Sequence, residues 1–219
     1  MPIHRRSKPL KRKQENLPER SRFLIYCEGE VTERLYFAAL KRQLRIPGVQ
    51  LGSAHGEPLG LVRAAIDHRD RAPKSAADQY APYSEVWCVV DVEAPTPHGS
   101  LEKALDLADR NGISYAVSNP CFEIWLLLHA RDQRGYVTTD QACSLLEAHG
   151  GCGYTRNGKS FDPVALLGSY EVARRRAQLL AETHIAESRW ASRNPSASVW
   201  KLVESLCKQV DGSNQAPAR

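Results

Sequence analysis

The strongest constraint on the fold is the apolar run Glu85–Val92, with the sequence EVWCVVDV, in which Asp91 ends the apolar residues and Glu93 follows two positions later. The run does not alternate between apolar and polar residues, so we expect a strand that is buried on both faces, as in a parallel sheet. Parallel neighbours require long crossover connections, which are usually helices. The rest of the chain is therefore expected to alternate strands with helices.

A second stretch, Phe23–Phe37 (FLIYCEGEVTERLYF), shows one such strand–turn–helix unit. The pattern predicts a strand at Arg22–Cys27 and a helix at Glu33–Arg45, with Thr32 as its N-cap. Glu28 then follows the carboxyl end of the strand, where open α/β sheets bind their ligands. A lone Glu in such a turn is more often a partner of the helix dipole than a catalytic group. A catalytic role for Glu28 therefore requires other acidic residues at the same edge of the sheet.

The same alternation continues to about residue 130 and predicts an α/β fold, a mostly parallel sheet flanked by helices. The expected elements are a weak strand at 49–53, a helix at 58–70, a helix from Ser100 to Asn111-Gly112, a strand at 113–117, and a helix with Asn119 as N-cap and Glu123 in its first turn.

Beyond residue 130 we expect only helices, as an extension packed on the α/β core. Thr138 and Gln141 form a capping-box pattern for a helix to His149, a long helix covers about 162–185, and a last helix follows Asn194-Pro195. The predicted organisation is a basic tail at 1–21, a core at 22–130, a helical extension at 131–212 and a disordered tail at 213–219.

The basic charge is concentrated at the N-terminus. Residues 1–22 carry eight Lys or Arg against two Glu, a net charge of +6, so the other 197 residues sum to −1 (+5 minus +6). Such a segment is either an arm that contacts nucleic-acid phosphates or a solvated leader. The candidate phosphate contacts are Arg5, Arg6, Lys8, Lys11, Arg12 and Lys13, with Lys159, Arg174 and Arg175 further along; an Arg run on a helix is more often a solvated face.

The six cysteines form no CxxC pair, which argues against a zinc or disulfide framework and favours a reducing compartment. Cys27, Cys88 and Cys121 lie in or beside apolar runs and are expected to be buried thiols. The sequence contains neither an apolar run of membrane-spanning length nor the apolar core of a signal peptide, so we expect a cytoplasmic protein.

Acidic residues follow three of the predicted strands. They are Glu28, then Asp91 and Glu93, then Glu123, and parallel strands bring their carboxyl ends to one edge. Crowded carboxylates need a cation, and hard oxygen ligands suit Mg²⁺ or Mn²⁺. Alternate residues of an extended segment point the same way, so Asp91 and Glu93 are expected to face one ion together.

Three of these motifs resemble the RloB family, which is associated with bacterial restriction and abortive-infection loci and is similar to Toprim domains. They are Glu28-Gly29 with Thr32-Glu33, Asp91-Val92-Glu93, and the segment 118–129, SNPCFEIWLLLH. The resemblance covers about residues 22–206 and implies a Toprim-like core. It also implies a Mg²⁺-dependent nuclease that acts on DNA or RNA in antiphage defence, with an AAA-type ATPase partner.

By this resemblance Glu28 is the general acid/base or a metal ligand, and Asp91 and Glu93 hold the metal. Glu33 and Glu123 are accessory metal ligands or site-shaping groups, and Asn119 is an accessory residue. Toprim domains usually have Asp where this chain has Glu93. A non-catalytic subunit that binds nucleic acid or the ATPase therefore stays open as an alternative, as does a homo-oligomer. Simpler roles also stay open: Glu33 as a dipole partner, Asn119 as a helix cap and Glu123 in a salt bridge with Arg. A primase or phosphatase is disfavoured because the sequence has no zinc finger.

Overall fold

A computed structural model of the chain describes residues 21–72 and 82–214. Strands and helices alternate through its first half, as the sequence predicts. The elements are β1 (Phe23–Cys27), α1 (Thr32–Leu44), β2 (Val49–Leu51), α2 (Pro58–Arg71), β3 (Glu85–Asp91), α3 (Leu101–Arg110), β4 (Ser114–Asn119), α4 (Glu123–Ala130), α5 (Thr139–His149), α6 (Val164–Leu167), α7 (Tyr170–Thr183), the 3₁₀ helix η1 (Trp190–Ser192), β5 (Ser196–Ala197) and α8 (Val199–Asn214).

The described elements form one five-stranded sheet in the order β2-β1-β3-β4-β5. The pairs β1–β2, β1–β3 and β3–β4 are parallel, and only β4–β5 is antiparallel. The predicted mostly parallel α/β sheet is therefore confirmed. The chain builds outward from β1 to β2 and then crosses back to place β3 on the other side of β1. This switch point between β1 and β3 is where α/β sheets of this kind bind ligands.

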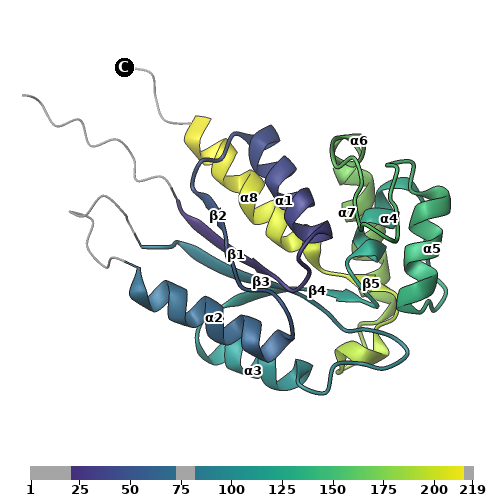
Figure 1. The fold of residues 1–219 in the computed structure, drawn as a ribbon, viewed down its shortest axis with the longest axis horizontal. Helices are drawn as coiled ribbons and strands as arrows, with labels where there is room; N and C mark the ends of the chain where they lie inside the picture. The colour runs from purple at the N-terminus through teal and green to yellow at the C-terminus, as the bar shows by residue number, and fades with distance from the viewer. Residues whose placement is uncertain (1–20, 73–81, 215–219) are drawn as a thin grey trace, which may run out of the picture.

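Helices cover both faces of the sheet, and each face has its own apolar core (Figure 1). Alternate residues of β1 point to opposite faces, with Leu24 and Tyr26 toward α2 and α3, and Phe23 and Ile25 toward α1 and the later helices. The C-terminal helices α4 to α8 all contribute to this second core, so they pack on the sheet domain itself.

Helix α4 is the most deeply buried helix of the fold. All residues from Glu123 to His129 are buried, and the helix packs against α5, α7 and β4. A helix that is apolar on every side can lie only inside a core. Its one carboxylate, Glu123, is held at the first turn, so the burial of α4 carries an acidic group into the interior.

Two features of the C-terminal half differ from the prediction. The sequence predicts no strand there, but the two residues of β5 pair with the end of β4, Ser118 with Ala197 and Asn119 with Ser196. A two-residue strand is too short to show a period in the sequence. The predicted long helix is also interrupted at Gly168, between α6 and α7. The capping box of Thr138 and Gln141 is confirmed.

Two predicted helix caps are wrong. Asn119 is the last residue of β4, and Phe122 occupies the N-cap position of α4 without a side-chain bond. Thr32 lies inside α1, whose N-cap is Val31. In both cases the polar side chain bonds a distant segment instead of its own helix, as described below.

The predicted tails lie almost wholly outside the described residues. This applies to Arg5, Arg6, Lys8, Lys11, Arg12 and Lys13, and to residues 215–219, whereas residues 213 and 214 belong to α8. Among the helices of the described ranges, none is both long enough and apolar enough to cross a membrane.

Candidate active site at the carboxyl edge of the sheet

Glu28 and Asp91 lie side by side because β1 and β3 are paired neighbours. Cys27 is in register with Val89, and the amide of Glu28 donates to the carbonyl of Val89 at 3.0 Å. The backbone N–H of Asp91 donates in turn to Oε2 of Glu28 at 2.9 Å. The sheet register therefore sets the relative position of these two acids, at the switch point of the fold.

Glu28 lies in a semi-buried position against the ring of His98. Its Oε1 is 2.7 Å from Nε2 of His98, and its side chain is 13% exposed. Burial raises the pKa of Glu28 to about 7, although the Asp91 amide and the His98 ring both oppose the rise. Glu28 is therefore able to gain or lose a proton near neutral pH. Sequence reasoning missed His98, because a single His in a Pro- and Gly-containing loop carries no pattern.

Asp91 is the most isolated acid of the group. It is buried, and its Oδ1 has no hydrogen-bond partner within the described part of the chain. Burial is the main reason that its pKa lies well above the ordinary value, and the negative charges of Glu33, Glu28 and Glu123 raise it further. Without a cation, this carboxyl group is held in a position that disfavours its own ionisation.

Glu33 is held against the turn that follows β1. Its Oε1 accepts a hydrogen bond from the amide of Gly29 at 2.8 Å. A Cβ at position 29 would lie 2.2 Å from Oε2 of Glu33, so any residue other than glycine would displace the carboxylate from this position. Burial raises the pKa of Glu33, and the negative charge of Glu123 adds to the rise, while the bond from Gly29 opposes it.

Glu123 joins the group from the first turn of α4. Its Oε1 accepts hydrogen bonds from the Tyr154 hydroxyl at 3.0 Å and from Thr32 Oγ1 at 3.3 Å. Thr32 therefore bonds an acid 91 positions away in the sequence rather than capping α1. The structure shows no salt bridge of Glu123 with an arginine among the described residues.

Glu93 lies next to this group but not in the predicted geometry. Strand β3 ends at Asp91, and Glu93 has a left-handed backbone with φ of 67°, so the segment is not extended there. Its Oε2 accepts a hydrogen bond from Thr139 Oγ1 at 2.6 Å, at the start of α5. The alternation argument that paired Glu93 with Asp91 is therefore wrong, although the charge of Glu93 contributes to the raised pKa of Asp91.

The amide of Asn119 has structural partners. Its Nδ2 donates to the carbonyl of Trp190 at 2.7 Å, and its Oδ1 accepts from Nδ2 of Asn194 at 3.0 Å. Asn194 also bonds both backbone groups of Val137. This network ties the end of β4 to the segment before β5.

The predicted phosphate-binding residues within the described part of the chain are Lys159, Arg174 and Arg175, and their surroundings differ. Arg174 forms ion pairs with Glu171 at 2.8 Å and with Glu204 at 3.6 Å, whereas Arg175 is exposed on α7. Lys159 is also exposed, and burial of its ammonium group alone would lower its pKa. The negative charges of Glu123, Cys143, Glu33 and Asp91 outweigh that effect and raise it. Lys159 therefore belongs to the acidic group electrostatically.

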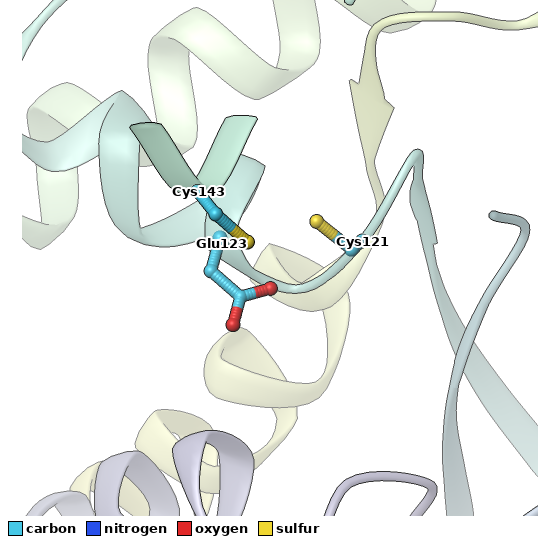
Figure 2. Close-up of side chains that lie close together, drawn as sticks. All are labelled: Cys121, Glu123 and Cys143. Carbon is cyan, nitrogen blue, oxygen red and sulfur yellow. The ribbon is translucent and has the colours of Figure 1, made fainter. Parts of the chain in front are cut away.

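A further cluster beside the acids was not predicted. Cys121, Glu123 and Cys143 are all buried, and their ligand atoms lie within 4.8 Å of one another (Figure 2). A hydrogen bond from the Cys121 thiol lowers the pKa of Cys143, and the same bond together with burial raises that of Cys121. Cys143 comes from α5, 22 positions after Cys121 (143 minus 121), so no spacing rule would have linked them.

The group around Asp91 suits a hard divalent cation. Its donors are carboxylate oxygens, and one of them is buried without a partner in residues 21–72 and 82–214. The pKa values of these carboxyl groups are raised by burial and mutual repulsion. A cation would relieve both effects, and oxygen ligands are those that Mg²⁺ and Mn²⁺ prefer. The residues present thus fit such an ion.

One comparison with known proteins identifies the chain. No curated protein and no solved structure matches it significantly. The family model described as RloB-like protein matches residues 23–206, which include every acid of the site. The chain therefore belongs to the RloB-like protein family.

Proposed function

We propose that this protein is a nuclease that uses Mg²⁺ or Mn²⁺ to cleave DNA or RNA in bacterial antiviral defence. The supporting observation is the convergence of Glu28, Glu33, Asp91 and Glu123 on the switch point of the sheet, with Oδ1 of Asp91 buried and unpartnered among the described residues. The link to defence comes from the family resemblance. A basic N-terminal segment would supply contacts to the phosphate backbone.

Asp91 and Glu28 would hold the cation, with Glu33 beside them. When bound, a divalent cation supplies a nucleophile at neutral pH and stabilises the charge that develops on phosphate oxygens. The amide of Asp91 fixes one oxygen of Glu28, and His98 lies against the other. These two contacts orient the Glu28 carboxylate at the edge of the sheet.

Glu28 would move the proton. Its pKa of about 7 lies near the operating pH, where a general acid or base is most effective. Asp91 and Glu123 are buried beside it. Lys159, whose charge faces the same acids, would limit their repulsion until a phosphate substrate and a cation are both present.

The test is cleavage of plasmid, single-stranded DNA and tRNA by purified protein with Mg²⁺ or Mn²⁺. We expect cleavage that requires the metal and falls by about 100-fold or more in Glu28→Gln and Asp91→Asn. The matched control is Glu102→Gln, which changes an exposed acid on α3. Cleavage that survives both site variants would exclude this reaction at this site.

The position of Glu93 favours a second candidate, a non-catalytic subunit that binds nucleic acid or a partner ATPase. The Glu93 carboxylate is bonded to Thr139, so it is less available as a metal ligand than its sequence position predicts. Calorimetry with Mg²⁺ separates the two functions. Heat of binding that is lost in Asp91→Asn supports the nuclease, whereas the absence of heat supports the binding subunit.

A further inference from the structure

A pair of thiols and a carboxylate form a compact donor set beside the acidic group. Cys121 lies in the loop between β4 and α4, Glu123 begins α4, and Cys143 lies in the middle of α5. Figure 2 shows the two sulfur atoms facing each other, with one carboxylate oxygen of Glu123 on the same side. Their donor atoms lie within 4.8 Å of one another, and all three residues are buried.

The chemistry of this set differs from that of the site at Glu28 and Asp91. Thiolates are soft ligands that select Zn²⁺ and related ions, whereas Mg²⁺ prefers oxygen ligands and water. We propose that Cys121, Cys143 and Glu123 bind a thiophilic divalent cation of the Zn²⁺ type, at a second site that is separate from the proposed nuclease metal.

The geometry requires little adjustment. Zinc binds sulfur at about 2.3 Å and carboxylate oxygen at about 2.0–2.2 Å, so two ligand atoms of a tetrahedral ion lie about 3.5–3.8 Å apart. Donor atoms that already lie within 4.8 Å of one another need to move by about 1 Å or less. Rotation about the Cys and Glu side-chain torsions is sufficient for a movement of this size.

Tyr154 can donate a hydrogen bond to the proposed ligands, as residues around a metal site commonly do. Its hydroxyl lies 3.0 Å from Oε1 of Glu123 and 3.7 Å from Sγ of Cys143, within hydrogen-bonding reach of both groups. Ligating carboxylates are commonly oriented by such a second hydrogen bond. Two of the three proposed ligands therefore share a partner that is independent of the cluster itself.

The charges of the site balance when the ion is bound. Binding releases the two thiol protons to solvent, because the ligands are thiolates. Two thiolates and one carboxylate carry −3, a divalent ion carries +2, and the nearby ammonium of Lys159 carries +1. The bound ion would join the loop before α4 to α5 and fix Glu123 at the border of the acidic group.

The test uses Co²⁺ as a probe of the full-length protein, under reducing conditions that keep the thiols free. Cobalt bound by thiolates shows a charge-transfer absorption that oxygen-only sites lack. We expect this band to saturate at one equivalent, to persist in excess Mg²⁺, and to disappear when Zn²⁺ is added. Metal analysis of the protein after dialysis against Zn²⁺ should give one equivalent.

The variants Cys121→Ala and Cys143→Ala should each abolish the band. Controls are Cys88→Ala, which removes a buried thiol from the opposite core, and Cys207→Ala, which removes a partly buried one on α8. Both controls should keep the band. Cys143→Ala without metal should retain the circular dichroism spectrum of the native protein, so that loss of the band reports loss of a ligand.

Two results would overturn the proposal. One is a protein that has its thiols reduced and native folding but shows no charge-transfer band. The other is a band that persists in both Cys121→Ala and Cys143→Ala. Neither result affects the cleavage test of Glu28→Gln and Asp91→Asn, so failure of this site is distinguishable from failure of the proposed nuclease function.

Discussion

Replacing Glu28 by Gln should remove a large part of the pH dependence of stability in the metal-free protein. The variant keeps the size and the hydrogen-bond acceptor of the side chain but cannot ionise. In the native protein the pKa of Glu28 is raised from 4.5 to about 7, mainly by burial. The folded state therefore holds a proton that the unfolded state has already lost between these two pH values.

The direction and the size of the change in stability with pH follow from this difference in pKa. A raised carboxyl pKa stabilises the protonated folded state below the ordinary pKa, and that stability is lost as the pH rises through the folded pKa. A shift from 4.5 to about 7 corresponds to about 3 kcal/mol, at 1.36 kcal/mol per pKa unit. For a chain of this size, that is roughly 6–12 °C in Tm.

The assay is thermal unfolding with a chelator present, at about pH 4 and about pH 8, which lie below the ordinary pKa and above the raised pKa. From the lower to the higher pH, the Tm of the native protein should fall by roughly 6–12 °C more than the Tm of Glu28→Gln does. Glu102→Gln, which changes an exposed acid, should behave as the native protein does. Equal pH dependence in the native protein and Glu28→Gln would refute the reasoning. Adding Mg²⁺ should stabilise the native protein more at the higher pH, where fewer protons compete.

Three further changes test other contacts. Gly29→Ala places a Cβ 2.2 Å from the Glu33 carboxylate, so the free energy of unfolding should fall by about 1–3 kcal/mol and Mg²⁺ should bind more weakly in calorimetry. Asn194→Ala removes the bonds that tie β4 to the segment before β5 and should cost about 1–3 kcal/mol in urea denaturation, whereas the exposed Asn157→Ala should cost nothing measurable. Thr138→Ala removes the capping box of α5 and should cost about 1 kcal/mol; an unchanged urea midpoint would contradict that role.

Much of the α/β core could be predicted because its signals are local. The apolar runs of β1 and β3 show burial on both faces, and the acids that follow them mark the carboxyl edge of the sheet. Neighbouring parallel strands then bring Glu28 and Asp91 together whatever the details of the loops. The capping box of Thr138 is equally local, since both of its bonds lie within one turn.

The tertiary structure decided what each polar side chain bonds. Thr32 and Asn119 have the residue types of helix caps, but packing gives them distant partners in Glu123 and Trp190. His98 reaches Glu28 through the fold of the loop that follows β3, and Cys143 reaches Cys121 and Glu123 because α5 packs against α4. The sequence by itself determined the sheet and the acids at its edge, because the pattern of apolar residues and the ends of the strands depend on residues that are close together in the chain. The partners of those acids depended on long-range packing, which no short pattern encodes.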